Sequence, residues 1–72
     1  MPAAVVDRLV AGDNPVKVWR EHRGLTQAAL AEQAALSQSY VAMIERGERV
    51  GGVDALRRIA RILTVDLDDL VD

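Results

Sequence analysis

Cysteine and phenylalanine are absent from these 72 residues, and tryptophan, tyrosine and histidine each occur once. Without cysteine there can be no disulfide, no thiolate metal site and no thiol nucleophile, and a reducing cytoplasm is the compartment that we expect. No apolar run approaches the roughly 20 residues that cross a bilayer, so we expect no membrane partner. The N-terminus also lacks the basic segment and long apolar stretch of a secretory signal.

An excess of positive charge is missing too, because nine lysine and arginine residues face eleven aspartate and glutamate residues, a net charge of −2. The distribution is uneven. Residues 15–50 carry five cations against four carboxylates, whereas residues 51–72 carry three arginines against five aspartates. Contact with phosphates must therefore come from a few placed cations and from helix N-termini, so we expect weak nonspecific binding with a shallow salt dependence.

Residues that could support catalysis or hold a metal are sparse. The one histidine, His22, has no second ligand of its kind, and the aspartates at 66, 68 and 69 lack the twelve-residue spacing and turn glycine of a calcium loop. No serine has a nearby base, and the Gly-Gly pair lacks the lysine of a phosphate-binding loop. We therefore expect no enzyme activity, no metal and no cofactor, and we interpret the aspartates as helix caps.

Two short helical runs lie within residues 25–49, separated by the stretch Ala-Ala-Leu-Ser at 34–37. Thr26 can cap the first run with its hydroxyl, which places Leu30 and Ala31 on the core face. The polar side chains of this run are then predicted to point to solvent, namely Gln27, Glu32 and Gln33.

The second run covers residues 38–46, with Ser37 as its N-cap and Gly47 at its end. Val41 and Ile44 lie three residues apart and share one face. A turn of three to four residues between two short helices is typical of a helix-turn-helix, whose second helix can enter the major groove of DNA.

The rest of the chain also reads as helix. Residues 2–11 form one helix, a second begins at Asn14 and Pro15, residues 53–63 form another, and a last short helix starts at Asp66. We expect an all-α fold, a compact bundle of five to six helices in one domain over residues 1–72, with residues 1–12 as an added helix. Apolar positions predicted to face the core include Val16, Trp19, Leu56, Ile59, Ala60, Leu63, Leu67 and Leu70, with Arg57, Arg58 and Arg61 outward.

At these residues the chain resembles the Cro and CI-type phage repressor family of small helix-turn-helix regulators. The resemblance covers roughly residues 15–70. Its carriers are Gly24-Leu25-Thr26-Gln27, Leu30-Ala31, Leu36-Ser37-Gln38, Ile44-Glu45-Arg46-Gly47, Leu56, Ile59-Ala60 and Leu63. It implies a lambda repressor-like domain that binds double-stranded DNA as a sequence-specific transcriptional repressor. It also implies a homodimer reading half-sites about 34 Å apart, in the cytoplasm and at the nucleoid when bound.

Two positions depart from the family pattern, because Ala35 and Thr64 stand where glycine is usual. If both keep a left-handed backbone, each costs about 1 kcal/mol. The capping box after Thr26 is also incomplete, because Ala29 replaces the glutamate that would reach back.

The resemblance implies base contacts from Gln38, Ser39 and Met43, with Tyr40 beside them. Glutamine can form two hydrogen bonds with the major-groove edge of adenine, and methionine offers an apolar surface to a thymine methyl, so the preference includes A·T pairs. Packing of Met43 into the core is the alternative. Contacts to the DNA backbone are implied for Thr26, Gln27, Arg46 and Arg49.

The resemblance also places Arg20 and Glu45 at the positions of an interior ion pair; the alternative is two exposed charges on separate helices. A second function stays open, an antitoxin that binds a small toxin protein and represses its own operon. The added helix would serve that partner through the stripe Val5, Val6, Leu9 and Val10, whose alternative role is packing against the bundle.

Overall fold

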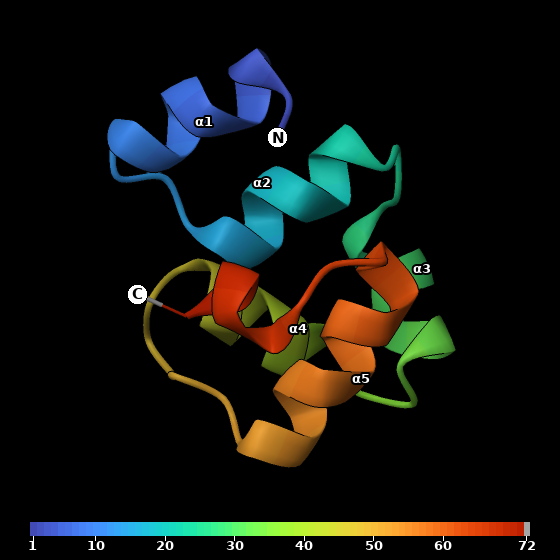
Figure 1. Ribbon diagram of the computed structural model, residues 1–72. Coiled ribbons are helices and arrows are strands. Elements are labelled where there is room, and N and C mark those ends of the chain that lie inside the picture. The colour runs from blue at the N-terminus through green and yellow to red at the C-terminus, as the bar shows by residue number, and fades with distance from the viewer. Residues whose placement is uncertain (72) are drawn as a thin grey trace.

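The computed structural model describes residues 1–71 and contains, over that range, five α-helices and one 3-10 helix. In chain order they are α1 (Ala3–Val10), α2 (Pro15–His22), α3 (Gln27–Gln33), α4 (Gln38–Glu45), α5 (Val53–Leu63) and η1 (Leu67–Leu70). Figure 1 shows α1 packed on α2 at one end of the molecule, with α2 lying between α1 and the other helices. The prediction of an all-α fold is confirmed. Over the described range, no helix has both the length and the apolar character needed to cross a membrane.

Three N-caps set where the middle helices begin. The side chains of Asn14, Thr26 and Ser37 each accept a hydrogen bond from the backbone N–H three residues later, at 3.1, 3.0 and 3.1 Å. A cap of this kind stabilises a helix by about 1 kcal/mol, so local sequence fixes these boundaries. At the last helix the Asp69 carboxylate accepts a hydrogen bond from the Asp66 N–H, so two of the C-terminal aspartates do act in capping.

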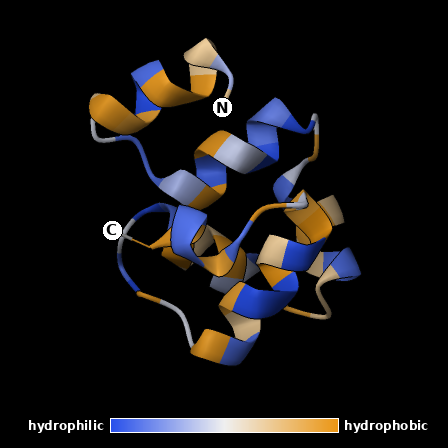
Figure 2. Ribbon diagram, in the orientation of Figure 1, coloured by the Kyte–Doolittle hydropathy of each residue, from blue (hydrophilic) through white to orange (hydrophobic). Residues whose placement is uncertain are grey.

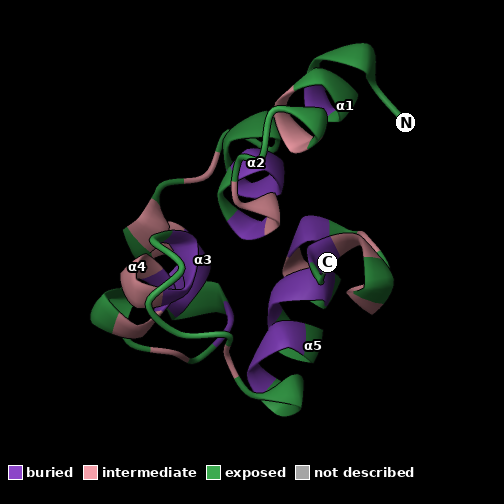
Figure 3. Cartoon of the chain, turned by 90° about the vertical axis from the view of Figure 1, so that its left-hand side faces the viewer, coloured by how far each residue is buried: buried purple, intermediate pink, exposed green. Residues whose placement is uncertain are grey.

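The core lies where α2, α3, α4 and α5 meet. Figure 3 shows the buried face of α5 turned toward the other helices, and Figure 2 shows apolar and polar positions alternating along the same helix. The arginines of α5 are exposed, as the pattern predicts. The most deeply buried side chains are Val5, Val16, Val18, Leu30, Val41, Ile59 and Leu63.

Helix α1 attaches to α2 through apolar and ionic contacts. Val5 is 1% exposed and belongs to the core cluster, and Leu9 packs against that cluster. Arg8 forms ion pairs with Asp13 and with Glu21 of α2. The apolar stripe suggested as a toxin-binding surface is therefore divided. Val5 and Leu9 pack within the protein itself, because the 3.6-residue helical repeat turns their side chains toward α2.

Both residues that replace glycine adopt the left-handed conformation, with φ 56° at Ala35 and φ 58° at Thr64. Ala35 lies in the turn between α3 and α4, and Thr64 is the C-cap of α5. The helix-turn-helix thus keeps its turn geometry with a Cβ present, at the cost of backbone strain.

Replacing Ala35 with glycine is expected to raise the free energy of unfolding by about 0.5–1 kcal/mol, because relief of left-handed strain exceeds the added entropy of the unfolded chain. The matched control is Ala34→Gly, one residue earlier, where φ is −89° and the side chain is buried. That change removes a buried methyl group without relieving strain and is expected to destabilise. Thermal unfolding of the two variants checks this, and a lower melting temperature for Ala35→Gly would contradict it.

Candidate nucleic-acid interface

The N-terminal edge of α4 faces solvent. Gln38 and Ser39 are exposed, while Val41 and Ile44 on the opposite face of the helix are buried. In Figure 3, α3 and α4 form one side of the molecule and α5 with η1 forms the other. An exposed helix edge held by a buried inner face is the arrangement that a helix needs to enter a groove.

Met43 lies one turn further along α4 and is half-buried. It stands outside the fully buried core, so part of its thioether side chain is available to an external apolar group. The expected base-contact set therefore has three members placed at or near the surface of α4.

Tyr40 makes a contact within the protein that the sequence did not predict. Its hydroxyl oxygen accepts a hydrogen bond of 2.9 Å from the Gly52 N–H, and its ring packs against the core. The side chain thus holds the loop between α4 and α5. Because the hydroxyl oxygen only accepts in this bond, the O–H can still donate, and a base contact from Tyr40 stays a prediction. The bond to Gly52 could not be predicted from the sequence, because Tyr40 and Gly52 are twelve residues apart and their relative position depends on the whole fold.

Arg20 and Glu45 form an ion pair in the interior, joining α2 to α4. Arg20 Nε lies 2.7 Å from Glu45 Oε2 and Nη2 lies 3.1 Å from Oε1, a bidentate arrangement. The two side chains are only 11% and 2% exposed. Hydrogen bonding to Glu45 raises the pKa of Arg20 above its ordinary value despite partial burial, so the guanidinium is permanently charged.

Gln27 belongs to the same network, which corrects the expectation that it points to solvent. Its Nε2 donates a 3.0 Å hydrogen bond to Glu45 Oε1, the oxygen that Arg20 Nη2 also reaches. Arg20 Nη1 in turn donates to the Leu25 carbonyl, just before α3. The network therefore connects α2, the start of α3 and the end of α4, and it fixes the two helices of the motif relative to the bundle.

Asn14 adds a second connection that the sequence did not reveal. Besides capping α2, its Nδ2 donates a 3.0 Å hydrogen bond to the Ile44 carbonyl near the C-terminus of α4. A cap residue uses only its side-chain oxygen, so the amide nitrogen remains free for a long-range partner. The choice of asparagine over serine at this cap is the signal that could have indicated it.

The cations beyond α4 are exposed but not equally available. Arg46 donates hydrogen bonds from Nε and Nη2 to the two oxygens of Glu48. The hydrogen bond from Arg46 lowers the pKa of Glu48, so this carboxylate stays ionised at neutral pH. It therefore competes with a DNA phosphate for the Arg46 guanidinium. Arg49 is exposed on the same loop.

The described residues contain no cluster of three or more histidine, aspartate or glutamate side chains suited to a metal ion. His22 is exposed on α2 and meets the edge of the Trp19 ring, with centroids 5.7 Å apart.

Known proteins match this chain in both sequence and fold. The helix-turn-helix family matches residues 16–70, which leaves α1 outside the match. The immunity repressor protein of Bacillus phage phi105 is 39% identical over 56 residues, a match that spans 78% of this chain but only 39% of the phage protein. The crystal structure of SinR, a master regulator for biofilm formation, in complex with DNA superposes with a TM-score of 0.74 and 29% identity, covering 79% of this chain and 92% of that one.

Proposed function

Because the chain belongs to the helix-turn-helix family, we propose that it binds double-stranded DNA through α4 and represses transcription from the sites that it recognises. The observation that carries this proposal is the exposed N-terminal edge of α4. Val41 and Ile44 pack the opposite face of the helix into the core, and the Arg20–Glu45 ion pair joins its C-terminal end to α2. The two relatives support it, since one is a phage repressor and the other has been crystallised with DNA.

In this proposal Gln38 and Ser39 contact base edges, and Met43 contacts a thymine methyl. Gln27 contributes to the DNA backbone through its second amide N–H, because an amide nitrogen carries two donors and Glu45 accepts only one of them. Thr26 lies beside it at the N-cap of α3. Glu45 then orients the Gln27 donor, and the buried guanidinium of Arg20 offsets the repulsion between that carboxylate and a phosphate.

We further propose that the second copy required for a two-fold site docks at the loop between α4 and α5. Val50 in this loop is 85% exposed, and Val53, the first residue of α5, is 59% exposed. Two valines alone provide far less than the roughly 800 Å² per partner of a stable interface, so we expect the dimer to form on DNA and the free protein to be monomeric.

Glu48 is expected to weaken binding to every DNA sequence alike, because its carboxylate pairs with the Arg46 guanidinium and competes with the DNA phosphates for it. Glu48→Gln should raise affinity by about tenfold and steepen the dependence of log affinity on log salt by about 1. Arg46→Ala should lower affinity for all sequences to a similar extent. Salt titrations on a selected site and on an unrelated duplex measure both variants, and an effect confined to one of the two duplexes would count against a phosphate role.

Selection of binding sites from random duplexes, followed by salt titration of the enriched sequence, tests the proposed function. The expected product is a pair of inverted half-sites, one helical turn apart centre to centre and containing A·T pairs. Recovery of no common sequence at low salt would refute sequence-specific binding.

The antitoxin alternative requires a partner-binding face on α1. Val5 is buried and Leu9 is half-buried against the core, so the exposed apolar positions of that stripe are Val6 at 37% and Val10 at 82%. Two exposed valines on α1 are too few to form the central buried cluster of residues that gives a protein–protein interface most of its binding energy. We therefore propose the repressor role without a toxin partner.

A further inference from the structure

Trp19 presents an unusual feature in the core. Its side chain is 5% exposed, and its indole Nε1 is, among the residues described, the buried side-chain nitrogen or oxygen that has no hydrogen-bond partner. A buried donor without an acceptor costs free energy, and a tryptophan in a core normally places this N–H against an acceptor. An acceptor supplied from outside the chain would remove the penalty.

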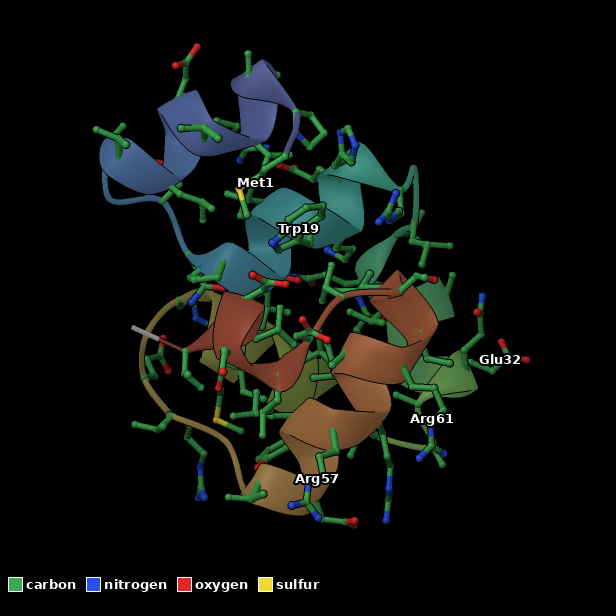
Figure 4. All side chains as sticks on the ribbon, viewed as in Figure 1. Met1, Trp19, Glu32, Arg57 and Arg61 are labelled. Carbon is green, nitrogen blue, oxygen red and sulfur yellow. The ribbon has the colours of Figure 1, made fainter. Side chains whose placement is uncertain are left out.

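A hollow of about 570 Å³ opens beside this indole, between α2, α5 and η1. Its volume lies within the range of sites for small molecules. It is distinct from the expected DNA-binding surface, because none of the residues expected to contact DNA borders it. In Figure 4, Met1 lies next to the Trp19 ring, and both border the hollow. The other bordering residues are Arg23, Ala60, Arg61, Thr64, Val65, Asp66 and Asp69.

The wall formed by α2 and the residue that follows it offers donors. Beside the indole N–H stands Arg23, whose guanidinium lies over the Trp19 ring, 5.3 Å from its centroid. Arg23 Nε donates to the Leu63 carbonyl, and within the described part of the chain its terminal nitrogens have no acceptor. Arg61 also borders the hollow, but Figure 4 shows its side chain pointing away from Trp19. This wall therefore suits a carboxylate.

The opposite wall offers acceptors. Asp66 is the N-cap of η1 and its carboxylate accepts from the Asp69 backbone N–H. Asp69, the third residue of η1, uses Oδ2 to accept from the Asp66 N–H, which leaves its second oxygen open. These carboxylates suit an ammonium group. Between the two walls lie the apolar groups of Ala60, Val65 and Met1.

We propose that this hollow binds a free α-amino acid as its zwitterion. The ligand carboxylate accepts from Arg23 and from Trp19 Nε1, its ammonium donates to Asp69 and Asp66, and a small aliphatic side chain lies against Ala60 and Val65. Because Nε1 is itself buried, the side chains that border the hollow must shift for the carboxylate to reach it. Because the hollow is open to solvent and the ligand has few atoms, the dissociation constant is expected to be about 1 mM.

The single tryptophan makes the test direct, since ¹⁵N-labelled protein has one indole N–H signal in a two-dimensional NMR spectrum. Each common L-amino acid is added in turn, up to about 10 mM. We expect at least one small aliphatic amino acid to move the signal downfield in a saturable manner. Its amide and its N-acetyl derivative, which lack one charge each, should bind at least about tenfold more weakly.

Two isosteric variants complete the test. Asp69→Asn retains an oxygen for the Asp66 N–H but loses the charge, and should lower the affinity for the amino acid about tenfold. Asp68→Asn changes the adjacent charge, which does not border the hollow, and should leave affinity unchanged. The proposal is overturned if no amino acid moves the indole signal, if both derivatives bind as well as the parent, or if the two variants behave alike. DNA binding through α4 stands or falls independently of these results.

Discussion

Replacing Arg20 with methionine is expected to lower the free energy of unfolding by about 3–5 kcal/mol, because the change leaves the Glu45 carboxylate buried without its countercharge. Glu45 would keep only the neutral hydrogen bond from Gln27. A domain of this size has a total stability of about 4–10 kcal/mol, so the loss removes much of the margin. Urea unfolding followed by circular dichroism measures it.

The double variant Arg20→Met/Glu45→Met separates the cost of an unpaired charge from the value of the pair. Removing both partners eliminates the buried charge, so the double variant is expected to recover at least half of the loss. Glu45→Gln, which keeps a hydrogen-bond acceptor, should fall between the single and double variants. A loss below about 1 kcal/mol for Arg20→Met would show that the pair behaves as an exposed one.

Replacing Gln38 with alanine is expected to cost about 1–3 kcal/mol of binding free energy on the selected duplex and to relax base preference at one position of each half-site. The reason is its exposed place at the N-terminal end of α4, where side chains reach base edges. The loss of a bidentate contact affects the correct base more than its substitutes. Competition binding with duplexes altered one position at a time measures the change.

Gln33→Ala is the matched control for this experiment. Gln33 is also an exposed helical glutamine, but it lies at the C-terminal end of α3, away from the leading edge of α4. Its replacement should leave both affinity and preference intact. If Gln38→Ala also preserves the relative affinities of all altered duplexes, the assignment of Gln38 to base recognition is wrong.

The helices could be predicted from sequence because their boundaries depend on short-range chemistry. Ser37 reaches an amide three residues away, and the left-handed turn at Ala35 occupies a place usually held by glycine. Each of these signals is contained in a few consecutive residues. Residues 53–63 were expected as a helix, and α5 has those bounds.

The site was harder to predict because several of its contacts join distant parts of the chain. Tyr40 and Gln27 both lie at helix positions that alone indicate exposure, yet one holds Gly52 and the other holds Glu45. The pairing of Arg46 with Glu48 is close in sequence, but its effect on a phosphate contact follows only from seeing both side chains together. Periodicity gives the face of a helix; it does not give the partner that the face meets.

The most direct test of the central claim, that the leading edge of α4 enters the major groove, is an NMR titration of labelled protein with the selected duplex. The account predicts that the largest backbone shifts fall at residues 37–43 and at the start of α3, with little change in α5 and η1. Shifts concentrated on the arginine face of α5, with the N-terminal edge of α4 unaffected, would contradict it.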